Sequence, residues 1–147
     1  MTDRPHATVA TIIERDGQFL MVKELRNGRT VFNQPAGHIE NGESIIEAAI
    51  RETLEETRWK VKPTFLSGVS VYHAPNGISY IRTTLVAEAV SEDIYANLDT
   101  GILEALWMDY EEILAHKTHL RSPIVLKVIE DYRQGKLFPL DLIFEQR

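Results

Sequence analysis

Three glutamates on one predicted helix are spaced to act on a common ligand. Glu52, Glu55 and Glu56 fall within an arc of roughly 100° on an α-helix, and Glu52 and Glu56 are neighbours one turn apart. Their mutual repulsion, a few tenths of a kcal/mol per pair, disappears when a hard cation binds. Oxygen ligands without histidine or cysteine favour magnesium, manganese or calcium. Acidic runs on helices are more often solvent-exposed faces, so the spacing alone leaves both interpretations open.

The residues before this helix complete a longer pattern. Gly37 is followed after five residues by Glu43, and after seven more by Arg51-Glu52-Thr53-Leu54-Glu55-Glu56. This arrangement closely resembles the Nudix box, in which a glycine, a distant glutamate, an arginine–glutamate pair and a glutamate pair stand at fixed spacing. Arg58 occupies a position where the family usually has glycine, which would ease the end of the helix. We expect the arginine to interact favourably with the helix dipole instead.

Motifs outside the box are similar to those of the phosphatase NudJ subfamily of Nudix hydrolases. These motifs are Phe32–His38, Leu120–Pro123 and Phe138–Leu140. The resemblance implies an α/β (α+β) fold, the Nudix α/β/α sandwich with a mixed central sheet and a catalytic loop and helix, as a single domain over residues 1–147. It also implies magnesium-dependent hydrolysis, with manganese as an alternative metal. The implied substrates are nucleoside tri- and diphosphates and the pyrophosphate of the thiamine pyrimidine precursor (HMP).

The same resemblance assigns roles within the box. Glu52 and Glu56 are expected to be the main metal ligands and Glu55 a further ligand or the partner of a metal-bound water, and all three are expected to be catalytic, with Glu52 the first choice as general base. A backbone carbonyl at Ala36 or Gly37 is expected to complete the metal site, since glycine allows the chain to approach an ion closely. Glu43 and Arg51 are expected to pair and hold the loop against the helix; the alternative is a surface salt bridge worth under about 1 kcal/mol.

Four residues outside the helix are further candidates. Glu104 is either an additional metal ligand or an exposed strand residue, and the sequence does not decide between them. Arg82 falls in the middle of a strand, where it either binds a substrate phosphate or, as the sequence favours, points to solvent. Arg121 precedes a predicted helix N-terminus, which suits an anion. His38 either lines the substrate pocket or is structural.

The predicted elements place one helix between two groups of strands. Ser44 and Glu47 form a capping box, which predicts a helix to about Trp59, with Pro63 beyond it helping to stop it. Its core face is predicted to comprise Ile46, Ala49, Ile50, Thr53 and Leu54. Alternating residues predict strands over His6–Glu14, Gln18–Glu24, Val31–Gln34, Phe65–His73, Ile78–Val90 and Leu103–Met108, and caps predict helices from Asp109 to about His116 and from Ser122 to near Gly135. We expect the tail, Leu137–Arg147, to pack back onto the domain.

Composition narrows the class of partner. The chain has 147 residues, 44% of them hydrophobic and 26% charged, with no cysteine and a formal net charge of -6. An acidic balance argues against a nucleic-acid polymer, and because carboxylates repel phosphates, a small diphosphate would need a divalent cation between the two. No stretch approaches the roughly 20 apolar residues of a membrane span. We therefore expect a cytoplasmic enzyme, monomeric or homodimeric, that is not bound to a membrane.

Three other functions remain to be compared with this one. The first is a Nudix pyrophosphatase for another nucleoside diphosphate derivative, such as a nucleotide sugar or an oxidised nucleotide. The second is a non-catalytic nucleotide-binding Nudix module, which predicts the loss of box glutamates, whereas all are present here. The third is a structural calcium-binding protein, which needs ligands alternating along a loop rather than a helix.

Overall fold

The architecture is a mixed β-sheet between helices, given by a computed structural model that describes residues 4–147. Strand β1 runs parallel to β6, and the other strand pairs are antiparallel. The strand order is β3-β2-β1-β6-β5, while β4 pairs with β1 and β7 pairs with β2. The strands are β1 (His6–Arg15), β2 (Gln18–Arg26), β3 (Arg29–Asn33), β4 (Ala36–His38), β5 (Trp59–His73), β6 (Ser79–Glu92) and β7 (Ile102–Asp109).

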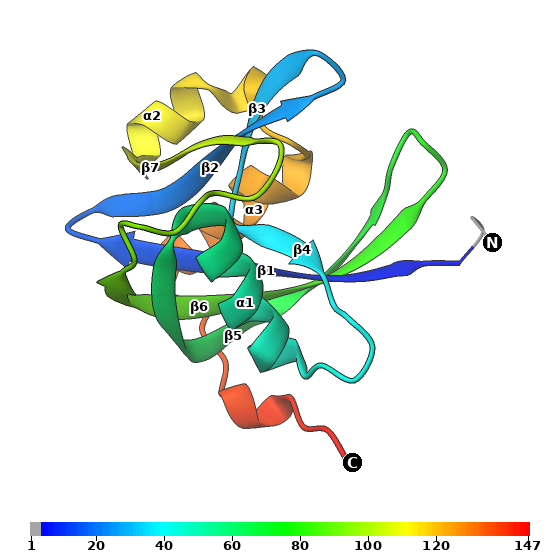
Figure 1. Ribbon diagram of the computed structural model, residues 1–147. Helices are drawn as coiled ribbons and strands as arrows, with labels where there is room; N and C mark the ends of the chain where they lie inside the picture. The colour runs from blue at the N-terminus through cyan, green and yellow to red at the C-terminus, as the bar shows by residue number, and fades with distance from the viewer. Residues whose placement is uncertain (1–3) are drawn as a thin grey trace.

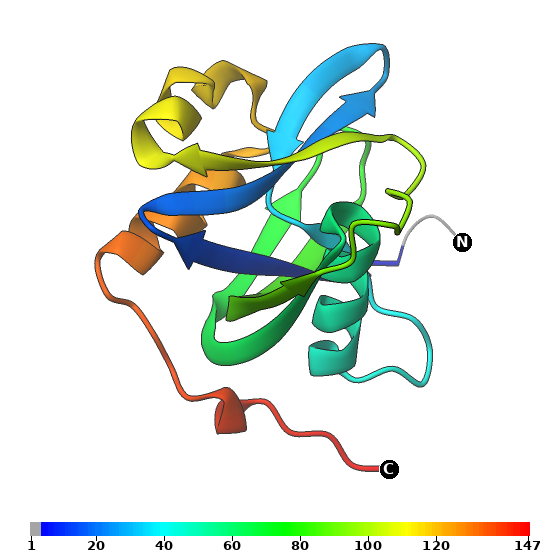
Figure 2. The ribbon, with the colours of Figure 1, turned by 60° about the vertical axis from the view of Figure 1, so that its left-hand side comes forward.

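The helices lie on opposite sides of the strands, as Figures 1 and 2 show. Helix α1 (Ile45–Thr57) covers one side, and α2 (Tyr110–Ala115) and α3 (Pro123–Arg133) cover the other. Two short 3-10 helices, Lys117–His119 and Leu140–Leu142, complete the chain. The expected α+β sandwich is therefore confirmed. No helix among residues 4–147 has the length and apolar character needed to cross a membrane.

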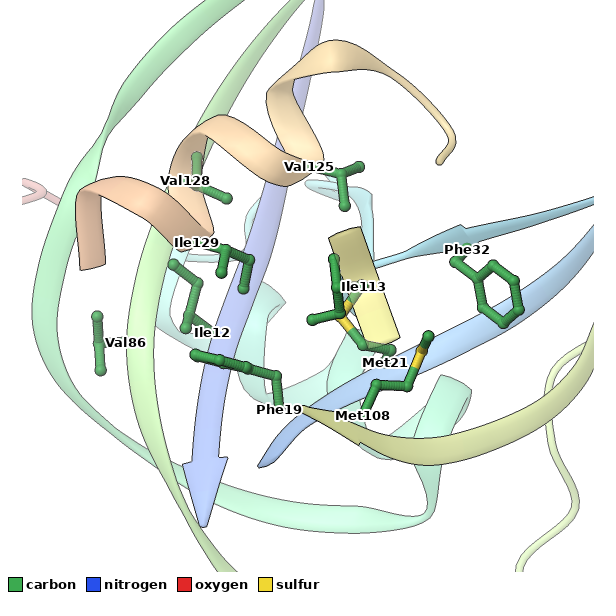
Figure 3. Close-up of a cluster of buried hydrophobic side chains, with 10 residues drawn as sticks. All are labelled: Ile12, Phe19, Met21, Phe32, Val86, Met108, Ile113, Val125, Val128 and Ile129. Atoms are coloured by element: carbon green, nitrogen blue, oxygen red, sulfur yellow. The ribbon is translucent and has the colours of Figure 1, made fainter. Parts of the chain in front are cut away.

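Hydrophobic side chains fill the space on both sides of the sheet. The cluster beneath α2 and α3, drawn in Figure 3, consists of Ile12, Phe19, Met21, Phe32, Val86, Met108, Ile113, Val125, Val128 and Ile129. A second cluster joins α1 to the sheet, and Leu140 and Ile143 of the tail pack against it. The prediction that the tail returns to the domain is thus confirmed.

The start of α1 follows the prediction, but its end does not. Ser44 Oγ accepts a hydrogen bond from the Glu47 backbone N–H, and the Glu47 carboxylate accepts one from Ser44 N–H, so the capping box is confirmed. The helix ends at Thr57, because Arg58 takes a left-handed conformation (φ 67°) and its N–H donates to the Leu54 carbonyl. The Arg58 guanidinium lies 3.6 Å from Glu92 instead of capping the helix end.

The residue after this turn begins a strand rather than ending a helix. Strand β5 starts at Trp59, so the chain reverses directly into the sheet and pairs with β6. Pro63 lies beyond the helix, as expected, but it lies within β5 beside a register shift, and the helix already ends at Thr57. A proline without an N–H is tolerated at such an irregularity.

The buried face of α1 also differs from the prediction. Its buried residues are Ala48, Ala49, Thr53, Glu56 and Thr57, whereas Leu54 is 36% exposed. The segment Ala36–His38, expected to be a loop, forms β4 and pairs with β1 beside the helix. Glu56 therefore lies on the packed face, because β4 brings backbone polar groups to that face.

Candidate active site

The backbone of β4 at Ala36 and Gly37 is the point where two helix carboxylates meet the sheet. Ala36 N–H donates to Glu56 Oε1 at 2.9 Å. A Cβ on Gly37 would lie 2.1 Å from Cδ of Glu52, so the Glu52 carboxyl group occupies the space that any other residue would need. Glycine is required here by close approach, and it keeps the Glu52 carboxylate against the strand.

These two carboxylates are held where negative charge is disfavoured. The pKa of Glu56 is raised to about 8, mainly by burial and also by the nearby carboxylates of Glu24, Glu52 and Asp99, while the hydrogen bond from Ala36 opposes the rise. Burial is also the main cause that raises the pKa of Glu52. A bound cation would reverse both effects, because it favours the ionised form of each carboxylate.

The donor set fits a hard divalent cation. The converging groups are the carboxylate oxygens of Glu52 and Glu56, which suit such a cation, with neither thiolate nor imidazole between them. Within residues 4–147, no three acidic or histidine side chains already lie close enough to hold an ion by themselves.

Arg51 connects the box residues to one another. Its Nε and Nη2 donate to the two carboxylate oxygens of Glu43 at 2.6 and 2.9 Å. Nη2 also donates to the His38 carbonyl at 3.0 Å, and Nη1 donates to Glu52 at 2.8 Å. The hydrogen bond from Arg51 holds the pKa of Glu43 below its usual range. The pair is bidentate and three-quarters or more buried, which makes it stronger than a surface salt bridge.

Two of the expected acidic residues lie further from β4. Glu55 is tied to Arg51 at 3.2 Å and its side chain is 43% exposed. Glu104 is exposed on β7, opposite Lys23. Because side chains alternate between the two faces of a strand, Glu104 shares a face with Leu106, which packs against the cluster beneath α2 and α3. The structure does not bring Glu104 to the carboxylate pair. The acidic neighbours of the pair are Glu24 and Asp99 and, beside Glu52, Glu55.

A cavity of about 370 Å³ opens beside β4. It is lined by Ala36, Gly37 and His38 together with residues of the other strands β1, β2, β3, β5 and β6, of α3 and of the segment before α3. Three arginines, Arg26, Arg82 and Arg121, and one glutamate, Glu24, contribute to its wall. The cavity thus carries a formal excess of two positive charges although the chain has a net charge of -6. Such a cavity attracts an anionic ligand.

Arg82 is buried in this wall, which overturns the solvent-facing interpretation favoured by the sequence. It is 7% exposed, and its Nη2 donates to Gln34 Oε1 at 2.7 Å. Gln34 in turn donates to the Val125 carbonyl in α3 at 2.8 Å. Burial lowers the pKa of Arg82 to about 10. The sequence did contain a signal, because Arg82 shares a strand face with the buried residues Thr84 and Val86.

Glu24 is a cavity residue that the sequence interpretation missed. It is 2% exposed, and Arg121 Nη1 and Arg26 Nε donate to its Oε2 at 3.1 and 3.4 Å. Its position on the face of Leu20 and Val22 could have revealed a charge directed towards the interior. Arg121 is therefore placed in the cavity by an ion pair with β2, not by the helix terminus alone.

His38 stands where β4 meets the cavity. Its Nε2 lies 2.9 Å from Nδ1 of His6, and burial, followed by the charge of His6, lowers its pKa. The three residues expected to contact substrate, His38, Arg82 and Arg121, thus share one cavity. Gly37 belongs to both the cavity wall and the carboxylate pair, so the two sets of residues are adjacent.

Fold and site together define a hydrolase of the Nudix class. The NUDIX domain model matches residues 3–128, and the chain belongs to this family, whose hydrolases generally use divalent metal ions. It acts on phosphoanhydride-type substrates. Among curated relatives, it is similar to phosphatase NudJ of Escherichia coli K12 and of Shigella flexneri, each 36% identical over 140 residues, covering 95% of this chain and 91% of the relative.

Solved structures agree with this assignment. A NUDIX hydrolase from Nitrosomonas europaea has 43% sequence identity and a TM-score of 0.95, with 97% of this chain and 98% of that chain covered. A MutT protein from Methanosarcina mazei Go1 has 21% identity and a TM-score of 0.74 over 92% of this chain and 99% of that chain, which shows likeness of fold alone. The resemblance of the box and of the flanking motifs to this family is therefore confirmed.

Proposed function

We propose that this enzyme uses magnesium to hydrolyse phosphoanhydride bonds in nucleoside tri- and diphosphates and in the pyrophosphate of the thiamine pyrimidine (HMP). One observation supports this most strongly. The carboxylates of α1 meet β4 at the rim of a cavity with an excess of positive charge, in a chain that is acidic overall. Diphosphate oxygens held between a cation and arginines match this distribution of charge.

The proposed metal ligands are the carboxylates of Glu52 and Glu56, with the backbone at Gly37 and, further out, Glu55. Magnesium, when bound there, would neutralise phosphate charge and lower the pKa of the attacking water. Manganese, which accepts the same oxygen donors, is the alternative metal. Glu104 is left out of this set, because it lies on the other face of β7.

The protein's own residues position and deprotonate the nucleophile. Glu52 is the proposed general base, and the raised pKa of its carboxyl group favours taking a proton from water. Arg51 donates to Glu52 Oε1 and so fixes the direction in which the other oxygen points. Both carboxylate oxygens of Glu43 accept hydrogen bonds from Arg51, which makes Glu43 a positioning residue.

The cavity residues bind the rest of the substrate. Arg82 and Arg121 attract its negative charge, and His38 lies at the rim next to β4. A volume of about 370 Å³ is large enough for a pyrimidine with part of its phosphate chain. The similarity to phosphatase NudJ over 95% of the chain supports the thiamine pyrimidine pyrophosphate as one substrate. The proposal keeps the cytoplasmic location that was expected from the sequence.

Phosphate release from a substrate panel tests the proposal. The panel contains nucleoside tri- and diphosphates, HMP pyrophosphate, nucleotide sugars and oxidised nucleotides, each with magnesium, manganese or EDTA. We expect release with magnesium, none with EDTA, and a fall in kcat of at least about 10²-fold in Glu52→Gln. Glu111→Gln, at an exposed acidic position on α2, is the matched control and should keep full activity. Equal rates in wild type and Glu52→Gln would refute the proposed site.

A further inference from the structure

The outer edge of β5 carries a stretch of unpaired backbone. β5 pairs with β6 along one side, and on the other side Leu66 exchanges two hydrogen bonds with Phe138, at 2.8 and 2.9 Å. From Ser67 to His73, no strand within residues 4–147 covers this outer edge. The hairpin of β5 and β6 extends away from α1 (Figure 1). An uncovered edge of this length is a template for another strand.

Apart from a β-bulge at Ser67, where the register between β5 and β6 shifts, the edge has few of the features that usually prevent pairing. Ser67–His73 contains no charged residue and no proline. Val69 and Val71 are 62% and 54% exposed, and Ile81, opposite Val71 on β6, is 41% exposed. Between this edge and α3 lies a groove of about 380 Å³, to which Ile124 and Val128 contribute apolar atoms. An added strand would therefore find both backbone partners and an apolar wall.

We propose that a second copy of the chain binds here, with the two β5 strands antiparallel about a two-fold axis at Ser70. The register follows from the limits of the edge. The Phe138 segment occupies the edge at Leu66, and β5 ends at His73. The longest overlap that both copies can share is Ser67–His73, and its centre is Ser70. Val69 then faces the partner's Val71, and Gly68 faces the partner's Tyr72.

This register is complementary in shape. Nothing lies within 4 Å of the position that a Cβ on Gly68 would occupy, so a large side chain opposite it meets open space. Aromatic residues across from edge glycines stabilise strand pairs. The four valines that meet across the axis form apolar cross-strand pairs, each of which stabilises pairing by roughly 0.2–1 kcal/mol.

Charge also favours a second copy over a charged peptide. The pairing edge is neutral, so it gives no attraction to an acidic or basic segment. The axis places both α3 helices antiparallel on the same side of the shared sheet. Each α3 presents Lys127 and Asp131 at the groove, paired with each other at 2.6 Å. Because this pair is neutral overall, the approach of a second α3 meets no net repulsion from it.

The size of the contact sets the expected strength. Seven residues a side are fewer than the 20–30 of a standard interface, so the flank of α3 must contribute and the dimer should be weak. We expect a Kd of roughly 10–100 µM. At lower concentrations the monomer should predominate.

Sedimentation velocity over a concentration series tests both the dimer and its register. Val69→Lys/Val71→Lys sets like charges opposite each other at both valine pairs, and we expect the Kd to rise at least about tenfold. Val69→Lys/Val71→Glu instead sets a lysine of one copy opposite a glutamate of the other at both pairs, and at low salt it should dimerise like the wild type. Val90→Lys, at a valine 60% exposed on β6, is the matched control and should not change the Kd.

Two outcomes would overturn the proposal. One is a wild type that stays monomeric up to about 1 mM. The other is a doubly lysine-substituted chain that dimerises as well as the wild type. Phosphate release by each variant at dilute concentration should match the wild type, because Val69 and Val71 face away from the cavity-lining Tyr72 and Arg82. Retained phosphate release would show that a variant that no longer dimerises is still folded.

Discussion

The carboxylate site and the cavity beside it differ in how they are built. The carboxylate site draws on one continuous stretch, from Ala36 to Glu56, in which a loop leads into a capped helix. The cavity draws on residues of strands β1 to β6, of α3 and of the segments between them, among them Glu24 on β2, Arg82 on β6 and Arg121 before α3. In the first region local spacing determines the geometry, whereas in the second it follows from the topology of the sheet.

This difference bears on what each region can tolerate. In the carboxylate site the contacts are short and specific, so a small displacement should affect the chemical step. In the cavity, several charged side chains attract the substrate together, so the loss of one charge should weaken substrate binding and leave the chemical step intact. Substitutions in the two regions should therefore separate effects on kcat from effects on KM.

The largest effect is expected from Gly37→Ala. The added methyl group would lie about 2.1 Å from the Glu52 carboxyl carbon, so the carboxylate must move away from β4. A displacement of about 1 Å in a catalytic group costs about 10²-fold in rate, and we expect kcat to fall by that amount. Gly68→Ala is the control, because its Cβ would meet nothing within 4 Å. A Gly37→Ala variant with wild-type kcat would show that Glu52 does not need this position.

Glu56→Gln should stabilise the metal-free protein at alkaline pH. The folded pKa of Glu56 is raised to about 8 from 4.5. The fold therefore keeps its full free energy of unfolding below about pH 4.5, where this side chain is protonated in both states, and loses part of it as the pH rises through 8. Glutamine avoids this loss and can still accept from Ala36. At pH 8.5 in EDTA we expect a gain of roughly 1–4 kcal/mol in the free energy of unfolding.

The measurement is urea unfolding at pH 5 and pH 8.5, with EDTA or with magnesium. The difference between Glu56→Gln and wild type should shrink at pH 5, where both side chains are neutral in the fold. Magnesium should stabilise the wild type more than the variant, because ligand binding to the folded state adds to its stability. A variant that is less stable than the wild type at pH 8.5 in EDTA would contradict the raised pKa.

The sequence was informative where neighbouring residues act together. The box residues, the capping box at Ser44 and the general order of strands and helices were all predicted from local pattern. The environment of Arg82 was not, because its burial depends on Gln34 and α3, which are distant in the chain. Glu104 was a candidate through its place along the chain, but the pairing of β7 with β2 turns it to the other face.

Arg121→Gln should affect binding without affecting the chemical step. The substitution removes one cavity charge and one partner of the buried Glu24, which Arg26 continues to contact at 3.4 Å. We expect KM to rise about tenfold with kcat within about twofold of wild type. Arg29→Gln, at an exposed position on β3 outside the cavity, should leave both unchanged. A fall in kcat with constant KM would place Arg121 in the chemical step instead.

The smallest effect concerns the end of α1, beyond the carboxylates. Arg58 adopts φ 67°, which costs a residue with a side chain roughly 1–2 kcal/mol, and glycine removes this strain. Arg58→Gly also loses the 3.6 Å contact with the half-buried Glu92, worth under about 1 kcal/mol. We therefore expect a net gain of about 0.5 kcal/mol and a rise in Tm of about 1–2 °C, with unchanged kcat. A clear loss of stability in differential scanning calorimetry would mean that the Arg58–Glu92 pair outweighs the backbone strain, and so that the departure from the usual box glycine stabilises this chain.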